Sequence, residues 1–238
     1  MTLLLIDGDI IAYKAAASAE TPINWGDGLW TLHSFEQDVA VRLDEQIDKL
    51  LTDAPVQDCI VALSDKENYR KELAAYYKAN RTNTRKPMLL AWAKEYLQSK
   101  YNTIIYRRLE ADDVLGILGT ANTDTIIWSE DKDLRTVPAK HWIDGDVVEI
   151  SEEEADYNFF VQTLVGDATD NYKGCPSVGY KTADKILEFG DGWGAVVRAF
   201  LSKGLSEAVA LENARLARIL RNGEYDTDTG EVKLWTPA

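Results

Sequence analysis

The sequence predicts an α/β fold in which helices cover both faces of a doubly wound, mainly parallel sheet. Four apolar runs are rich in β-branched residues and alternate little with polar ones, at 3–6, 59–63, 103–106 and 125–128. Continuous apolar runs of this kind are typical of strands that are buried on both faces. Helical patterns lie between these runs, at 35–51, 66–76, 88–99 and 111–118. The alternation indicates a doubly wound domain that extends to about residue 150.

Two helix starts match the capping box, in which a serine is followed three residues later by a glutamate. These are Ser64 with Glu67 and Ser151 with Glu154. The second box opens a mainly helical region, with helices expected at 151–165, 180–189, 193–202 and 205–221. The tail at 224–235 alternates around a Thr-Gly turn and is expected to form a terminal hairpin or an edge strand. We therefore expect an α/β core at 1–150 and a helical unit at 151–238.

Cysteine usage and hydropathy exclude several protein classes. Cys59 and Cys175 have no metal-ligand spacing, and two cysteines are too few for a disulfide scaffold, so a reduced, cytoplasmic setting is expected. Asp7 and Asp9 interrupt the apolar start, and no basic stretch precedes it, which argues against a secretory signal. No run approaches the roughly 18 apolar residues of a membrane span, so a membrane partner is not expected.

Carboxylates gather in five short clusters, four of them at or just beyond an apolar run. The clusters lie at 6–9, 64–65, 110–113, 130–133 and 166–170. Side chains that leave the carboxyl ends of neighbouring parallel strands meet in one crevice. Packed carboxylates raise one another's pKa unless cations neutralise them. The pattern therefore predicts a divalent metal site, and oxygen ligands without clustered His or Cys favour Mg²⁺ or Mn²⁺.

The formal net charge of −14 hides a strongly basic segment. Residues 66–108 contain eleven Lys or Arg against three Glu. Within it, the stretch 77–87 is polar and basic, ends at Pro87, and is expected to form an exposed loop or a short helix over the crevice. A basic segment beside an acidic site suits a phosphodiester substrate. The alternative is that the basic residues simply form a solvated helical face.

Individual acidic motifs leave alternatives open. Asp7 and Asp9 could be metal ligands, the two aspartates of a phosphohydrolase that forms an aspartyl-phosphate, or an ordinary Asp-Gly turn. Glu110 and Asp112 cannot share one face of a helix, because residues two positions apart point away from each other. If both bind metal, Glu110 must precede the helix in an extended conformation.

The stretch 174–182, GCPSVGYKT, approaches a phosphate-binding Walker loop but departs from it, because one residue separates the second glycine from Lys181. A helix-hairpin-helix turn fits better, since Gly174 and Gly179 bracket a tight loop before a helix. With Lys181 and Thr182, such a helix N-terminus would hold a backbone phosphate without reading base sequence. An ordinary turn between helices is the alternative.

Five motifs in this order resemble the 5′ nuclease superfamily of flap endonucleases and polymerase-associated 5′ exonucleases. The motifs are LLIDGD, SDKENYRKELAAYYKANR, EADDVLG, SEDKDL and LVGDATDNYKGCPSVGYKTADKIL, and the match covers roughly residues 2–190. The stretch ARLARILRNGEYD with the LW that follows is similar to the 5′-to-3′ exonuclease of short-tailed bacteriophages of the T-seven type. The resemblance implies a PIN-like core with a basic helical arch at about 66–100 and a C-terminal helix-hairpin-helix unit.

The resemblance also implies roles for individual residues. A first divalent ion would be bound by Asp7, Asp65, Glu110, Asp112 and Asp131. A second ion would be bound, partly through water, by Asp113, Asp133, Asp167 and Asp170. The catalytic cations would be Lys78 and Arg81, three positions apart on one helix face. DNA contacts would come from Tyr77, Arg70, Gly174, Gly179, Lys181 and Thr182, with Tyr77 stacking on an unpaired terminal base or packing internally. Carbonyls of the hairpin would bind K⁺, whereas Asp9 has no counterpart among the usual ligands.

The implied activity is hydrolysis of DNA phosphodiester bonds near the 5′ end of duplex, nicked or flapped DNA, with two Mg²⁺ or Mn²⁺ ions. An RNA strand in an RNA–DNA hybrid is a further implied substrate, and we expect a monomer that acts in the cytoplasm, that of the host if the chain is phage-encoded. A metal-activated hydroxide needs no histidine base, in agreement with the positions of His33 and His141 outside every motif. The alternatives are an aspartyl-phosphate phosphohydrolase with a small-molecule substrate, and a catalytically silent DNA-junction binder, which would not need an unbroken acidic set.

Overall fold

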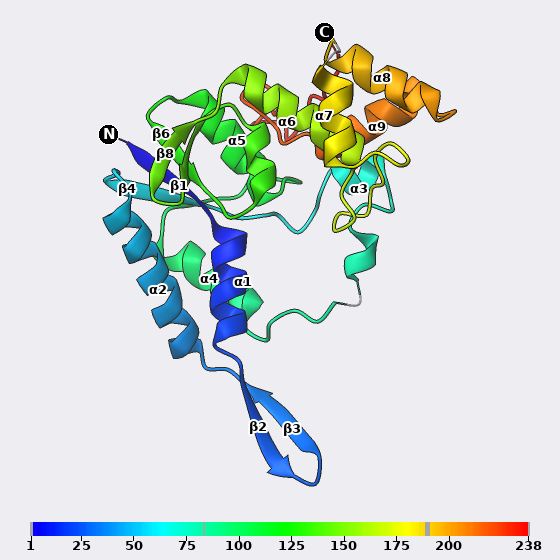
Figure 1. Ribbon diagram of the computed structural model, residues 1–238. Coiled ribbons are helices and arrows are strands. Elements are labelled where there is room, and N and C mark those ends of the chain that lie inside the picture. The colour runs from blue at the N-terminus through cyan, green and yellow to red at the C-terminus, as the bar shows by residue number, and fades with distance from the viewer. Residues whose placement is uncertain (1, 83, 189–190, 238) are drawn as a thin grey trace.

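The computed structural model describes residues 2–82, 84–188 and 191–237. Its centre is a six-stranded sheet with the order β5-β4-β1-β6-β7-β8 (Figure 1). All neighbouring pairs are parallel except β7 with β8. The strands are β1 (Leu3–Asp7), β4 (Asp58–Ala62), β5 (Thr103–Ile104), β6 (Thr125–Trp128), β7 (Lys140–Ile143) and β8 (Asp146–Glu149). The predicted α/β class with a doubly wound, mainly parallel sheet is confirmed.

Helices precede, separate and follow the strands. Those of the first part of the chain are α1 (Gly8–Ser18), α2 (Glu36–Asp53), α3 (Arg70–Leu73), α4 (Leu90–Lys100) and α5 (Ala111–Ala121). Those of the second part are α6 (Glu152–Val165), α7 (Tyr180–Glu188), α8 (Trp193–Ser202) and α9 (Glu207–Ala217). Two 3-10 turns, η1 (Ala79–Arg81) and η2 (Lys132–Thr136), lie next to acidic or basic motifs.

The sheet is buried on both faces, as the continuous apolar runs predict. In β1, Leu4 and Ile6 face the side covered by α1, α2 and α4. Leu5 faces the other side, where α5 packs together with Ile219 and Leu220 from the C-terminal segment. The two layers of helices leave the carboxyl end of the sheet to the loops, which is where the acidic motifs lie.

The structure contains a helix and two hairpins that the apolar runs do not predict. The helix α1 follows β1 directly, and Asp7 caps it by accepting a hydrogen bond from the Ile10 N–H at 3.2 Å. An antiparallel hairpin of β2 (Thr21–Gly26) and β3 (Leu29–His33) projects away from the body beyond α1 and α2 (Figure 1). The pair β7–β8 turns at Asp144 and Gly145, both at positive φ. An Asp-Gly pair is a strong hairpin signal.

The helix expected at 66–76 is wrong, because α3 covers only four residues. The Asp65 and Asn68 side chains accept hydrogen bonds from the nearby Lys66 and Arg70 N–H groups, and such local bonds compete with helix formation. Ser64 does not cap this segment; its hydroxyl accepts from the Ala111 N–H at the start of α5. At the second predicted box, the Ser151 hydroxyl does accept from the Glu154 N–H, at 3.1 Å.

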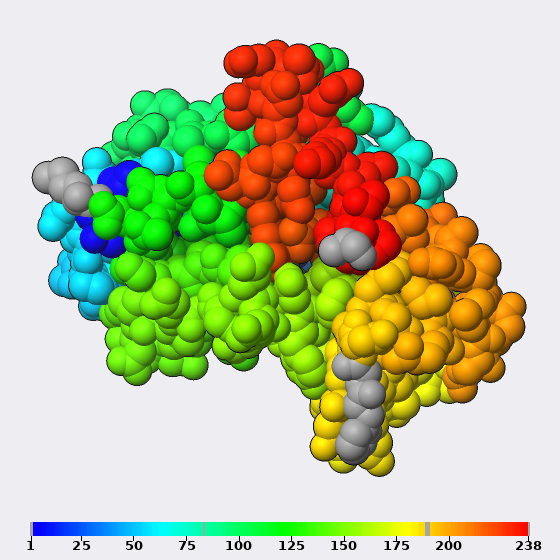
Figure 2. Space-filling model, turned by 90° about the horizontal axis from the view of Figure 1, so that it is seen from above, coloured from blue at the N-terminus to red at the C-terminus, as the bar shows by residue number. Residues whose placement is uncertain are grey.

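Helices α6 to α9 enclose a second apolar cluster that includes Leu164, Val196 and Phe200. After α9 the chain returns to the α/β part, where Ile219 and Leu220 pack against it. Figure 2 shows this C-terminal segment, in orange-red, between the green α/β part and the orange helices. Farther on, Tyr225 and Val232 form a single antiparallel bridge. No helix in the described residues has the length and apolar character needed to cross a membrane.

Candidate active site

The site begins where β1 and β6 end side by side. Asp7, the last residue of β1, is 2% exposed, and its second carboxylate oxygen accepts a hydrogen bond from the Ser129 hydroxyl at 2.8 Å. The same hydroxyl accepts from the Asp131 N–H at 3.0 Å, so one serine fixes both acidic segments. Burial raises the pKa of Asp7 to about 6, and the charges of Asp9 and Asp131 add to the rise, against the lowering effect of the Ser129 hydrogen bond.

Asp112 on α5 joins this group. Burial raises the pKa of Asp112 well above its ordinary value, and the charges of Asp7 and Asp131 raise it further. Buried carboxylates this close together are costly to keep ionised without a nearby cation. Asp7, Asp112 and Asp131, from three different acidic clusters, therefore form one electrostatic unit.

Glu110 lies beside the unit and is already neutralised. It is the N-cap of α5 in an extended conformation, as joint binding with Asp112 requires. Its carboxylate forms an ion pair with Lys78 and accepts from the Tyr77 hydroxyl at 2.9 Å. Burial raises the pKa of Glu110, but Lys78 and Arg70 outweigh this effect and hold it at about 2.

A second acidic group consists of Asp133, Asp167 and Asp170. Burial raises the pKa of Asp133 to about 6, and Asp131 and Asp167 raise it further. The Gln162 amide of α6 donates to Asp133 at 2.6 Å. Gly166 has φ of 72°, which turns the chain into the loop where the Asp167 carboxylate accepts from the Asp170 N–H. The two acidic groups meet at Asp131, whose carboxylate also accepts from the Asp133 N–H at 2.9 Å.

The two expected catalytic cations converge on Asp170, although not from one helix face. Lys78 precedes η1 in the left-handed conformation, with φ of 55°, which breaks the predicted helix. Lys78 Nζ lies 3.5 Å and Arg81 Nη2 lies 2.6 Å from the carboxylate of Asp170. Burial lowers the pKa of Lys78, but Glu110 and Asp170 outweigh it and raise the pKa overall, so Lys78 stays protonated.

Farther along the basic segment, Arg85 binds the Glu20 carboxylate with two nitrogens, at 2.8 and 2.6 Å. The Met88 N–H donates to the same carboxylate at 2.8 Å. The predicted exposed loop is therefore tied to the base of the β2–β3 hairpin. Apart from η1 the described residues of 77–87 contain no helix, whereas the region expected as a basic helical arch, at about 66–100, also includes α3 and α4.

Asp113 and Arg70 do not have the positions expected of a metal ligand and a DNA contact. The Arg70 guanidinium donates to both oxygens of Asp113, at 2.6 and 2.8 Å, and both side chains are at most 4% exposed. Asp113 also accepts from the Glu110 and Leu220 N–H groups. Arg70 further donates to the Leu216 carbonyl at 3.0 Å. This pair thus joins α3, α5 and the C-terminal segment in the interior.

Burial and hydrogen bonding bear on three further expectations. The Tyr77 ring is 3% exposed, which favours packing over base stacking. The Asp65 carboxylate accepts from the Lys66 and Arg108 N–H groups, both at 2.7 Å. Gly174 is buried; a Cβ there would lie 2.4 Å from the Gly166 nitrogen, so its role is close packing of the loop.

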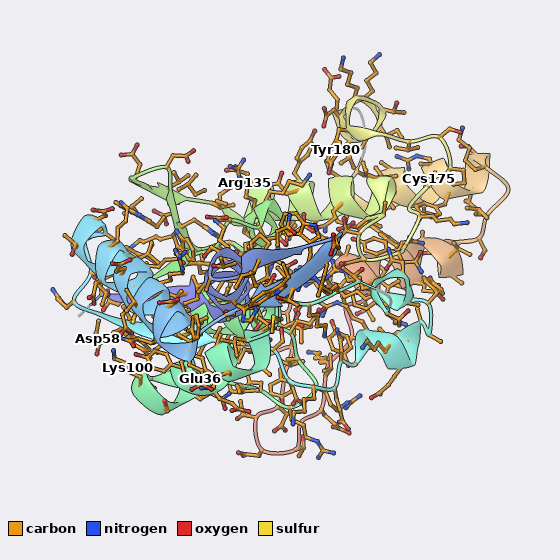
Figure 3. All side chains as sticks on the ribbon, turned by 90° about the horizontal axis from the view of Figure 1, so that it is seen from below. Glu36, Asp58, Lys100, Arg135, Cys175 and Tyr180 are labelled. Atoms are coloured by element: carbon orange, nitrogen blue, oxygen red, sulfur yellow. The ribbon has the colours of Figure 1, made fainter. Side chains whose placement is uncertain are left out.

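The other expected DNA contacts lie at the surface. Gly179, Lys181 and Thr182 are exposed at the start of α7. Tyr180, labelled in Figure 3, links this start to η2, because Lys132 Nζ donates to its hydroxyl at 2.9 Å. The expected turn therefore sits beside the loop that carries the acidic residues of η2.

Some residues of the site are missing from the sequence analysis. Ser129 stands between the fourth apolar run and the EDKD cluster, and a hydroxyl in that position could have been suspected as a carboxylate partner. Gln162 carries no such signal, because its contact with Asp133 arises from tertiary packing. Asp9, whose role the motifs leave open, lies 2.7 Å from Lys94 Nζ and thereby ties α1 to α4.

The donor set suits a hard cation. The carboxylates approach one another, but no group of three in the described residues already forms a set of metal ligands. An open arrangement of carboxylates fits an ion such as Mg²⁺, which keeps several water ligands. Gln162 Oε1 and Tyr172 Oη are buried near Asp133 without a hydrogen-bond partner in the described chain, as expected where ordered water belongs.

A family model described as the 5′-3′ exonuclease, N-terminal resolvase-like domain matches residues 2–161. The chain belongs to this 5′-3′ exonuclease family. It is 27% identical to the exodeoxyribonuclease of Enterobacteria phage T3 and 26% identical to the exonuclease of Escherichia phage T7. Each alignment covers 99% of this chain and 93% of the relative, which confirms the similarity to exonucleases of the T-seven type.

Solved structures agree on the fold. A phage T5 protein co-crystallised with metal ions has a TM-score of 0.68 at 16% identity, over 91% of this chain and 89% of that chain. A phage T5 flap endonuclease in a pseudo-enzyme-product complex with DNA and metal ions has a TM-score of 0.59 at 17% identity, over the same two fractions. At these identities the likeness concerns the fold, and it confirms the PIN-like architecture that the family implies.

Proposed function

We propose that this member of the 5′-3′ exonuclease family is a metal-dependent nuclease that hydrolyses DNA phosphodiester bonds near 5′ ends, flaps included. The observation that carries the proposal is the acidic unit of Asp7, Asp112 and Asp131 with protonated Lys78 beside it. Carboxylates alone would repel a phosphodiester, whereas carboxylates that hold cations next to a lysine attract one. The T5 relative crystallised with DNA and metal ions supports the same assignment.

The acidic unit with Glu110 would hold one divalent ion, and Asp133, Asp167 and Asp170 would hold another, with Mg²⁺ or Mn²⁺ favoured by the oxygen donors. When bound, such ions supply a hydroxide nucleophile at neutral pH and neutralise charge on the leaving oxygen. Ser129 orients Asp7 and the backbone of Asp131 toward one another, which preorganises the ligands.

Lys78 and Arg81 would bind the scissile phosphate and stabilise the charge that develops on it. Both now pair with Asp170, so binding of substrate would exchange a carboxylate partner for a phosphate. Because the pKa of Lys78 is raised, the residue acts as a fixed positive charge and not as a general base.

The exposed start of α7 would hold the duplex through a backbone phosphate, with Lys181 and Thr182 as side-chain contacts. Contacts of this kind do not read base sequence, so an RNA strand in an RNA–DNA hybrid is also proposed as a substrate. We further propose K⁺ on the carbonyls of residues 174–182, a monomeric enzyme, and action in the cytoplasm of an infected cell, in keeping with the phage relatives.

The aspartyl-phosphate alternative finds less support. Both oxygens of Asp7 are engaged, one by the Ile10 N–H and one by the Ser129 hydroxyl, and the side chain is 2% exposed. A nucleophile needs an accessible oxygen. The family match to nucleases points the same way.

The test is product sizing on 5′-labelled blunt, nicked and flapped duplexes, with Mg²⁺ or with EDTA. We expect short 5′-phosphorylated products with Mg²⁺ and intact substrate with EDTA. Equal products under both conditions would rule out the metal-dependent reaction. A covalent phosphoenzyme trapped during turnover would favour the phosphohydrolase.

A further inference from the structure

Two buried polar atoms beside the second acidic group have no hydrogen-bond partner. They are Gln162 Oε1 and Tyr172 Oη, two of the four such side-chain atoms in the described part of the chain. Buried polar atoms are nearly always paired in folded proteins, so an unpaired atom marks a place where water or an ion belongs. Both residues adjoin Asp133 or Asp167, which makes a shared explanation reasonable.

The orientation of Gln162 follows from its contact with Asp133. Gln162 Nε2 donates to Asp133 Oδ2 at 2.6 Å, and an ionised carboxylate can only accept, so the amide nitrogen must face it. The oxygen of the same planar amide then points elsewhere and requires a donor.

Tyr172 approaches from the opposite strand of the loop. Its backbone exchanges two hydrogen bonds with Asp167, each 2.9 Å long, and its side chain is 2% exposed. The ring packs in an apolar cluster with Phe159 and Leu216, so its position is well determined. The Tyr172 hydroxyl oxygen is buried and has no hydrogen-bond partner in the described residues.

We propose that Gln162 and Tyr172 are positioning residues that hold a water molecule on the divalent ion bound by Asp133, Asp167 and Asp170. A cation-bound water directs its lone pair to the metal and offers two protons, which match the two acceptor oxygens. The inference rests on the proposed function, because it assumes that this acidic group binds a divalent ion. Gln162 would have two roles, because its amide nitrogen orients Asp133 and its amide oxygen orients the water.

The test uses the full chain without DNA. Mg²⁺ binding is measured by titration calorimetry for the wild type, Tyr172→Phe and Gln162→Leu, and thermal unfolding is measured with and without Mg²⁺. Loss of such a partner outside the ligand set typically weakens metal binding about 10- to 100-fold, and we expect the lower end for each variant. Metal-free Tyr172→Phe should be at least as stable as the wild type, because it loses an unpaired buried hydroxyl.

A positioning role predicts that Tyr172→Phe loses Mg²⁺ affinity but keeps or gains stability in the metal-free protein. A tyrosine with only a structural role would lose stability in the metal-free protein and keep its Mg²⁺ affinity. Tyr157→Phe is the matched control, because its hydroxyl donates to Asp184 at 2.9 Å, away from the acidic group, and should not change Mg²⁺ binding. If the wild type binds Mg²⁺ and both variants bind it equally well, this inference fails alone. If the wild type binds no divalent ion, the proposed function fails as well.

Discussion

Replacement of Asp7 by asparagine should stabilise the metal-free protein while it abolishes metal-dependent cleavage. Asparagine is as good a helix N-cap as aspartate, so the hydrogen bond from the Ile10 N–H is kept. What the substitution removes is a buried negative charge that lies near Asp112 and Asp131. The ionised Asp7 carboxylate therefore lowers the free energy of unfolding of the metal-free protein.

The magnitude follows from the pKa. The pKa of Asp7 rises from 3.8 to about 6, chiefly because of burial. Since the folded-state pKa lies above the unfolded-state value, folding disfavours the ionised form, and the cost is fully present above the folded-state pKa. The shift corresponds to about 3 kcal/mol at pH 8 and about 2 kcal/mol at pH 5.5, and it disappears below the unfolded-state pKa. Asp7→Asn removes this cost, and it also removes one of the charges that raise the pKa of Asp112.

The assay is urea unfolding in EDTA at pH 8 and pH 5.5, repeated at pH 8 with Mg²⁺. We expect Asp7→Asn to exceed the wild type in free energy of unfolding by about 3 kcal/mol at pH 8, and by less at pH 5.5. Mg²⁺ should raise the stability of the wild type much more than that of the variant. Asp9→Asn, which loses the ion pair with Lys94, is the control and should not be stabilised. A variant less stable than the wild type at pH 8 in EDTA would refute the reasoning.

Three further predictions concern the cations. Arg70→Met should lower the free energy of unfolding by about 3–5 kcal/mol in urea, because it leaves the buried Asp113 carboxylate without its ion-pair partner. Adding Asp113→Leu to the same chain should recover part of this loss, and no recovery would argue against a buried ion pair. Lys78→Ala should lower the single-turnover cleavage rate constant about 10²- to 10³-fold while duplex affinity changes little. An equal loss of duplex affinity would instead assign Lys78 to substrate binding. Lys181→Ala should weaken duplex binding and reduce the slope of log K against log salt by about 1, whereas the control Lys49→Ala on α2 should keep the wild-type slope. If Lys181→Ala also keeps the wild-type slope, Lys181 does not contact the duplex.

The sheet could be predicted from the sequence because its signal is local. Strands β1, β4, β5 and β6 each overlap a continuous apolar run of the sequence, whereas β7 and β8 do not. The β2–β3 hairpin is harder to predict, because both strands are largely exposed and lack the apolar pattern of a buried strand. An Asp-Gly turn from strand to helix at Asp7 and Gly8 is compatible with α1, but the length of the helix depends on tertiary packing of residues such as Ile11 and Ala15.

The acidic unit was also predictable, since parallel strands bring the residues after them to one edge. The internal ion pair was not, because Arg70 and Asp113 are 43 residues apart and nothing local distinguishes a buried arginine from one at the surface. The same limit applies to Asp113, which shares its motif with Asp112 yet faces the interior. Arg70 and the C-terminal segment, which donates the Leu220 N–H to Asp113, make the two neighbours different, and both contacts arise from tertiary packing.

The central claim is that the acidic unit performs the chemistry on DNA, and Asp112→Asn tests it most directly. Single-turnover cleavage of a 5′-labelled duplex is measured with Mg²⁺ at saturating enzyme, beside duplex affinity measured in Ca²⁺. We predict that the variant binds DNA within a few-fold of the wild type and cleaves it at least about 10³-fold more slowly. Cleavage at the wild-type rate, with the same Mg²⁺ requirement, would contradict the account.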